Sequence, residues 1–306
     1  MVSTTKEQLG QLPTEARNPR SEDIDELSTL DMLRVINDED ATIAAAVRAS
    51  IPQIAEAVDA IADRFTRAGR LFYLGAGTSG RLGVLDASEC PPTFSVPRGL
   101  FVGLIAGGDS ALRTSSEGSE DSPAAGATDL AGYSLTPEDT VMGIAASGRT
   151  PYVVGALEYA SQAGALTIAL TCAGGAPARS RMAQAAQIAI ELATGPEVLT
   201  GSTRMKAGTA TKLALNMIST GVMIRSGAIY GNLMVNVQPT NAKLVDRAQR
   251  IIAAATGCDQ LTAERLLREA GEVKIAILMQ KLGLPFAAAK AKLRYVGGSL
   301  RKALVP

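Results

Sequence analysis

The chain has 306 residues, of which 46% are hydrophobic and 20% are charged, so it is long and apolar enough to bury a substantial core. Its 30 Lys and Arg residues balance its 30 Asp and Glu residues, and this neutrality argues against nucleic acid or an anionic membrane surface as a partner. The chain contains no histidine, which excludes a Ser-His-Asp triad and leaves acid–base chemistry to carboxylates, Lys, Tyr or Cys.

The three cysteines, Cys90, Cys172 and Cys258, lie far apart and show none of the paired spacings typical of zinc or disulfide sites. The first residues lack the apolar region of a secretory signal. Apolar runs fall short of the ~18 residues that a membrane-spanning helix needs. We therefore expect a soluble cytoplasmic protein without a metal site, in which Cys90 serves packing rather than chemistry.

The N-terminal part, residues 1–55, is predicted to form an arm followed by helices. A helix is expected to begin at Ser28-Thr29, because a hydroxyl residue there precedes apolar residues at near-helical spacing. A second helical pattern covers about 41–68 and is expected to break or begin again near Pro52.

Residues 56–228 alternate short apolar runs with helix-compatible segments, which predicts the repeated βα pattern of a doubly wound, five-stranded parallel sheet in three α/β/α layers. The strands are expected at 71–74, 100–106, 141–146, 165–171 and 186–192, and the helices at 79–89, 109–118, 151–163, 176–184 and 203–225. Such sheets bind ligands at the carboxyl ends of their strands.

Residues 229–306 begin with a turn-rich linker and return to helical periodicity. Glycines at 257, 271 and 283 mark breaks in that periodicity, so we expect a small domain of three helices.

A glycine-rich loop follows the first predicted strand and contains Gly77, Thr78, Ser79 and Gly80. Backbone N–H groups at the start of the following helix would favour an anion there. A dinucleotide site would need an acid after the next strand, where Asp109 stands. A nucleotide P-loop is disfavoured because Arg81-Leu82 replaces the required Lys-Ser or Lys-Thr. The loop is also compatible with a phosphomonoester site and with a turn that serves only close packing.

Two further polar loops follow later strands. The loop after the third strand contains Ser147, Gly148 and Thr150, and the polar segment that enters the last long helix contains Ser202, Thr203 and Lys206. Hydroxyl and amide donors suit a terminal phosphate, and the absence of a lysine-rich pocket favours a small sugar phosphate over a triphosphate. The alternative is that these residues only cap helices and that Lys206 lies on a solvated face.

Two glutamates are candidate acid–base groups. Glu89 precedes two prolines that should end the first crossover helix, and the negative carbonyl end of a helix favours a protonated carboxyl group. Glu120 lies in an acidic segment after the second strand, on the ligand-binding edge of the predicted sheet. The alternative is that each glutamate is an exposed charged residue in a loop, without a catalytic role.

The residues that carry these features resemble the N-acetylmuramic acid 6-phosphate etherases, a family that contains a sugar isomerase (SIS) domain. The resemblance covers nearly the whole chain and is most specific in the segment that ends in Glu89-Cys90-Pro91-Pro92 and in Gly201 to Lys206. The matching segments are residues 14–18, 74–82, 86–92, 104–108, 117–122, 200–212 and 232–235.

The resemblance implies a lyase that cleaves the D-lactyl ether of N-acetylmuramic acid 6-phosphate to N-acetylglucosamine 6-phosphate and D-lactate in cell-wall amino-sugar recycling, without metal or other cofactor. It implies Glu89 as the proton donor, Glu120 as the second acid–base residue, the polar loops as the sugar-phosphate site, and a homodimer. The alternative is a non-catalytic sugar-phosphate-binding regulator similar to the glucokinase regulatory proteins. An SIS isomerase would share the loops but gives no reason for the turn at Glu89.

Overall fold

The computed structural model describes residues 12–114, 118–176 and 178–305. They form two compact units. The sheet unit contains the described residues up to Ser88 and from Gly99 to Ile218, and the helical unit contains 89–98 together with the described residues from Ser219 onward. In this division the N-terminal helices belong to the same unit as the sheet, and the domain boundaries expected after residues 55 and 228 remain predictions.

The sheet unit is built on five parallel strands in the order β2-β1-β3-β4-β5, so the predicted doubly wound α/β architecture is confirmed. The strand positions agree with the apolar runs in the sequence. The strands are β1 Leu71–Gly75, β2 Phe101–Ile105, β3 Thr140–Ala145, β4 Leu166–Thr171 and β5 Ile188–Glu191.

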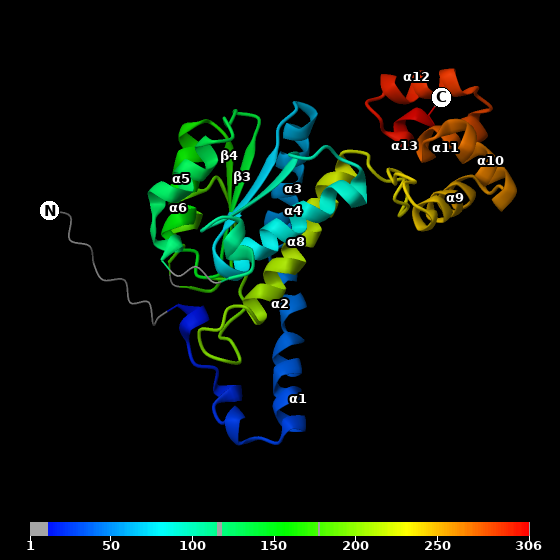
Figure 1. Cartoon of the computed structure of the whole chain (residues 1–306). Helices are drawn as coiled ribbons and strands as arrows, with labels where there is room; N and C mark the ends of the chain where they lie inside the picture. The colour runs from blue at the N-terminus through cyan, green and yellow to red at the C-terminus, as the bar shows by residue number, and fades with distance from the viewer. Residues whose placement is uncertain (1–11, 115–117, 177, 306) are drawn as a thin grey trace. The chain divides into compact units, whose positions relative to one another are not determined.

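Helices cover both faces of this sheet. Phe72 and Leu74 of β1 belong to one apolar cluster with Val153 of α6 (Pro151–Gln162). The residue between them, Tyr73, points to the opposite face of the sheet. There it packs closely on α4 (Gly77–Phe94), since a Cβ added to Gly83 of this helix would lie 3.0 Å from the Cβ of Tyr73. Figure 1 shows α5 and α6 on one side of the sheet and α3, α4 and α8 on the other.

The remaining crossover elements complete the pattern. A 3₁₀ turn at Asp109–Leu112 and helix α5 (Pro123–Ala131) join β2 to β3, and α7 (Arg181–Ala185) joins β4 to β5. Helix α8 (Lys206–Arg225) follows the last strand.

The crossover from β2 to β3 differs from the expected helix over 109–118. In the described part of that range the structure has the 3₁₀ turn, and Gly118 adopts a left-handed conformation with φ +86°. Residues 115–117 lie outside the described residues, as does residue 177 of the helix expected at 176–184. The crossover helix in the structure is α5. At its start the Ser122 side chain accepts a hydrogen bond from Ala125 N, and Pro123 lies in the first turn. Apolar periodicity alone does not reveal this helix start.

The expected end of α4 at the prolines is also wrong. The helix continues through Pro91 and Pro92 to Phe94. Each proline lacks an N–H, so the carbonyl groups four residues earlier, at Ala87 and Ser88, receive no helical hydrogen bond from them.

The N-terminal helices follow the predicted pattern. Ser28 caps α1 (Thr29–Asp40) by accepting a hydrogen bond from Asp31 N. The second pattern is divided at Ser50 into α2 (Ile43–Ala49) and α3 (Ile51–Thr66), and Pro52 lies in the first turn of α3, where it is tolerated.

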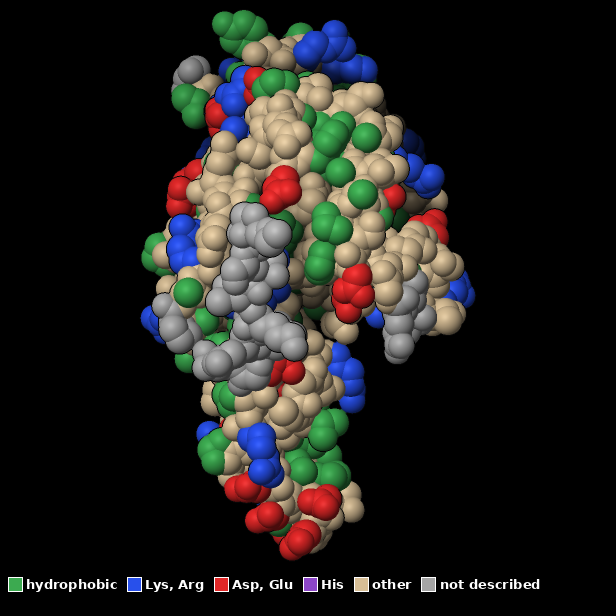
Figure 2. All heavy atoms as spheres, turned by 90° about the vertical axis from the view of Figure 1, so that its left-hand side faces the viewer, with side chains coloured by type: hydrophobic (Ala, Val, Ile, Leu, Met, Phe, Trp, Pro, Cys, Tyr) green, Lys and Arg blue, Asp and Glu red, His purple; other side chains and the backbone are tan. Residues whose placement is uncertain are grey.

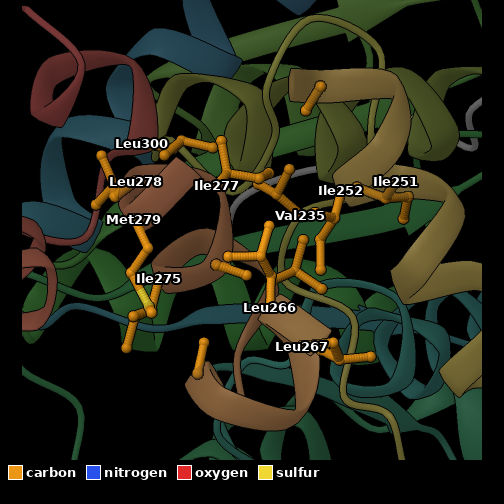
Figure 3. Packing of buried hydrophobic residues seen from close by; sticks show 14 of the residues in the cluster. Val235, Ile251, Ile252, Leu266, Leu267, Ile275, Ile277, Leu278, Met279 and Leu300 are labelled. Atoms are coloured by element: carbon orange, nitrogen blue, oxygen red, sulfur yellow. The ribbon is translucent and has the colours of Figure 1, made fainter. Parts of the chain in front are cut away.

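The described residues from 229 onward form five helices rather than the three expected. They are α9 Ala242–Thr256, α10 Gln260–Ala270, α11 Val273–Leu282, α12 Phe286–Tyr295 and α13 Leu300–Ala303. The three marked glycines do end α9, α10 and α11, each in the left-handed conformation. Their apolar faces share one core, in which Val235, Ile252, Leu266 and Ile277 lie together (Figure 3). None of the described helices has the length and apolar character needed to cross a bilayer.

A buried ionic cluster joins α1 to the start of α8. The Nζ of Lys206 lies 2.6 Å from Oε2 of Glu39 and donates a second hydrogen bond to Pro196 O at 3.1 Å. Arg20 Nε approaches the other oxygen of Glu39 at 3.0 Å. The side chains of Glu39 and Lys206 are 4% and 5% exposed, so each needs its partner. Burial alone would raise the pKa of the Glu39 carboxyl, but the hydrogen bond and charge of Lys206 bring it below the usual 4.5.

Replacing Lys206 by methionine should lower the free energy of unfolding by about 3 kcal/mol, because Glu39 would keep a buried charge with only Arg20 beside it. Urea unfolding of the purified variant measures this. The matched control is Arg34→Met, which breaks an exposed ion pair with Asp31 and should cost under ~1 kcal/mol. Equal losses in the two variants would contradict a structural role for the buried pair.

The same pair predicts an acid-dependent stability. Since the folded-state pKa of Glu39 lies below 4.5, its ionisation stabilises the fold above pH 4.5, and this contribution is lost as the pH falls through the folded pKa. Urea unfolding of wild type and Glu39→Gln from pH 7 to pH 3 should show a stability gap that narrows upon acidification. A gap that widens would contradict this sign.

Candidate active site

A polar cavity of about 210 Å³ opens at the carboxyl ends of β1 and β3. Strand β1 pairs with β2 on one side and β3 on the other, so the crossovers that leave β1 and β3 diverge at this point, where doubly wound sheets bind their ligands. The cavity brings together seven of the residues predicted for the site: Gly77, Thr78, Ser79, Glu120, Ser147, Thr150 and Thr203.

The first loop supplies the start of α4. Gly80 N donates to Ala76 O at 3.1 Å, so the N–H groups of Gly77, Thr78 and Ser79 precede the first closed helical turn and have no carbonyl partner within the helix. Gly77 has φ +52° and open space beside it. Gly80 does not line the cavity: a Cβ there would lie 2.6 Å from Gly75 O, so this glycine serves the close packing of helix on strand.

The second loop presents two hydroxyls. Thr150 is the N-cap residue of α6, yet its side chain makes no capping hydrogen bond, which leaves the hydroxyl for the cavity that it lines. Ser147 lines the same wall. Gly148 shapes the turn between them: its φ is +67°, and a Cβ there would lie 2.5 Å from the Cβ of Ser180.

The third loop contributes Thr203 alone among its three predicted residues. Glu197 caps α8 instead of Ser202 or Thr203, since its carboxylate accepts hydrogen bonds from Lys206 N at 2.8 Å and Ala207 N at 2.9 Å. Burial raises the pKa of the Glu197 carboxyl above its usual value. Lys206 does not line the cavity, because its ammonium group is held by Glu39.

Two carboxylates of the described residues line the cavity, and one of them was not predicted. Glu120 comes from a 3₁₀ turn, Ser119–Asp121, and Glu15 from another, Pro13–Glu15. A Cβ on Gly201 would lie 3.3 Å from Oε2 of Glu15, so a glycine in the third loop makes room for this side chain. The signal available in the sequence was the position of Glu15 within a segment, 14–18, that resembles the etherases.

Glu89 lies on α4, ten residues after Ser79 in the sequence, and is exposed. It belongs to the helical unit. Because α4 continues beyond it for five residues, the expectation of a helix end at this carboxyl group is wrong. Its role as proton donor remains a prediction that rests on the resemblance.

The cysteines provide no nucleophile at this cavity. Burial raises the pKa of the Cys172 thiol to about 12, and its Sγ lies 3.5 Å from Ala207 O. Cys90 is 2% exposed, whereas Cys258 is half-buried in the helical unit.

Two family models match the sheet unit and part of α8. The N-terminal SIS domain of glucokinase regulatory protein matches residues 53–161, and the SIS domain matches residues 122–220. An N-acetylmuramic acid 6-phosphate etherase from Brucella anthropi is 55% identical over 97% of this chain and 96% of its own. The chain belongs to the N-acetylmuramic acid 6-phosphate etherase family.

Further etherases of this family are equally similar. Those from Enterobacter sp. (strain 638) and Yersinia pestis (strain Pestoides F) are 55% and 56% identical, each over 97% of this chain and 99% of its own. A solved phosphoheptose isomerase from Francisella tularensis is 18% identical, with a TM-score of 0.48, and the match covers 64% of this chain and 98% of that one.

Substituting Gly148 by alanine should distort the second loop, because the added Cβ would meet Ser180 and the positive φ is unfavourable for alanine. We expect a loss of about 2 kcal/mol in the free energy of unfolding, measured by urea titration. The control is Gly132→Ala, where φ is −60° and the nearest atom to the new Cβ is 3.7 Å away. A Gly148→Ala variant as stable as this control would contradict the assigned strain.

Proposed function

We propose that this protein is a lyase that converts N-acetylmuramic acid 6-phosphate to N-acetylglucosamine 6-phosphate and D-lactate, in the recycling of cell-wall amino sugars. The observation that carries the proposal is the 55% identity to an etherase over 97% of the chain. The cavity supports it independently, because its hydroxyl and amide donors suit a phosphate monoester and it contains a carboxylate for proton transfer.

The phosphate is proposed to bind at the start of α4, where the N–H groups of Gly77 to Ser79 and the hydroxyls of Thr78, Ser79, Ser147 and Thr150 offer hydrogen bonds. Helix α4 adds the positive end of its dipole. Among the described residues, neither lysine nor arginine lines this cavity, so neutral donors supply the recognition.

The reaction is proposed to proceed on the open-chain sugar. A base removes the C2 proton, which the adjacent C1 aldehyde acidifies, and the C3–O bond breaks with transfer of a proton to the departing lactate oxygen. Water then adds to C3 of the resulting alkene, and C2 regains a proton. Two carboxyl groups can perform all these transfers, which fits a chain without histidine.

We assign these transfers to Glu120, which lines the cavity, and to Glu89 as the proton donor for the leaving lactate. No step of this scheme requires a metal ion or another cofactor. The non-catalytic regulator is not favoured, because the relatives matching nearly the whole chain are etherases.

We further propose a cytoplasmic homodimer. Helix α1 buries only Glu39, while Leu30 and Leu33 on it are 58% and 53% exposed and Leu27 before it is 41% exposed. Figure 2 shows hydrophobic side chains on the surface at the α1 end of the sheet unit. An unpartnered apolar surface of this kind suits contact with a second copy.

Replacing Glu89 or Glu120 by glutamine should lower the rate of D-lactate release from N-acetylmuramic acid 6-phosphate by 10²- to 10⁴-fold, roughly the worth of a general acid or base. Sugar-phosphate binding should persist, because the amide keeps the shape of the side chain. Enzymatic detection of D-lactate measures the rate, with the exposed Glu56→Gln of α3 as control. Release at the parent rate from either variant would remove that residue from the mechanism.

A further inference from the structure

A second hollow, of about 330 Å³, lies between α4 and α8 in the sheet unit. Thr78 and Leu82 of α4 line one wall, and Thr209, Lys212 and Leu213 of α8 line the other, with Arg204 in the loop two residues before α8. In contrast to the polar cavity, most of its surface is apolar, yet it carries two cationic side chains. We call this hollow the α4–α8 groove.

The groove adjoins the polar cavity. Thr78 lines both, and the consecutive residues Thr203 and Arg204 line the cavity and the groove respectively. A ligand that placed its phosphate against the start of α4 would therefore have the groove beside it. The two hollows differ in chemistry, since hydroxyl, amide and carboxylate groups line the first, whereas apolar groups and two cationic side chains line the second.

The two cations of the groove differ in their contacts within the protein. Arg204 is exposed, and its guanidinium makes no hydrogen bond or ion pair with another described residue. Lys212 Nζ forms a long ion pair with Oδ1 of Asp86 at 3.8 Å, too long for a hydrogen bond, so the ammonium group can still donate hydrogen bonds to a ligand. With apolar walls on both sides, such charges favour an anion that carries a small hydrocarbon group.

We propose that the α4–α8 groove binds the lactyl substituent of the substrate, with Arg204 and Lys212 holding its carboxylate and Leu82 and Leu213 contacting its methyl group. This assignment rests on the proposed function. The lactyl group is attached at C3 and the phosphate at C6, so the two groups extend in different directions from one sugar and can occupy the two hollows together.

The groove would then distinguish substrate from product. N-acetylglucosamine 6-phosphate has the phosphate but lacks the lactyl group, so only the substrate gains the contacts with Arg204 and Lys212. Binding energy from the lactyl carboxylate also fixes the C3–O bond that must break, which makes these two cations positioning and specificity residues.

The test compares two ligands in a variant whose turnover is slowed at least ~10²-fold. Calorimetry on Glu120→Gln should show tighter binding of N-acetylmuramic acid 6-phosphate than of N-acetylglucosamine 6-phosphate. In the Glu120→Gln background, a second substitution, Arg204→Gln or Lys212→Gln, should weaken substrate binding about 10- to 100-fold, as expected for the loss of one charge-assisted hydrogen bond. The affinity for the product should stay within ~2-fold of that of Glu120→Gln alone. Arg204→Lys should recover part of the loss.

The control is Arg48→Gln on α2, an exposed arginine that lines neither hollow, and this variant should change neither affinity. Equal weakening of substrate and product, or no weakening of substrate, would overturn the assignment of the groove. Failure of the proposed function has a different signature, because the wild-type protein would then release no D-lactate, while calorimetry would still report whether the lactyl group adds affinity.

Discussion

The position of β1 between β2 and β3 is the constraint on which the site depends. From β1 the chain adds β2 on one side, and it then returns to the other side of β1 to add β3, β4 and β5. As a result α4, which follows β1, and α6, which follows β3, cover opposite faces of the sheet, although both begin at the carboxyl ends of their strands. The first turns of these two helices lie beside each other, and each exposes N–H groups that have no partner within its helix. A polar cavity at this edge follows from the topology, and the side chains of the loops only refine it.

Charged residues near the cavity mainly support the architecture. Glu197 caps α8, and Lys206 joins that helix to Glu39 of α1. These contacts fix the segment that carries Thr203 and Arg204, and they connect the N-terminal region, from which Glu15 reaches the cavity. The buried ion pairs thus help to position hydroxyl and amide donors at the cavity, which among the described residues no lysine or arginine lines.

Local sequence patterns predicted the sheet well, because five buried strands between helices produce apolar runs that few other folds share. The loops after β1 and β3 were predictable for the same reason: their place at strand ends follows from the pattern. The buried position of Lys206 was not predictable, since its partner Glu39 lies 167 residues away and no local pattern encodes that pairing. Glu15 was missed because the return of an N-terminal segment to the cavity is a tertiary event. The continuation of α4 through Pro91 and Pro92 likewise contradicts local propensity.

The burial of the thiols has a practical consequence for studies of the protein in solution. Cys90 and Cys172 are enclosed and Cys172 stays protonated near neutrality, so a maleimide or iodoacetamide reagent meets only Cys258 with partial access to solvent. The native chain therefore offers a single attachment point for a fluorophore or spin label, remote in sequence from the residues that line the cavity, without any engineered cysteine.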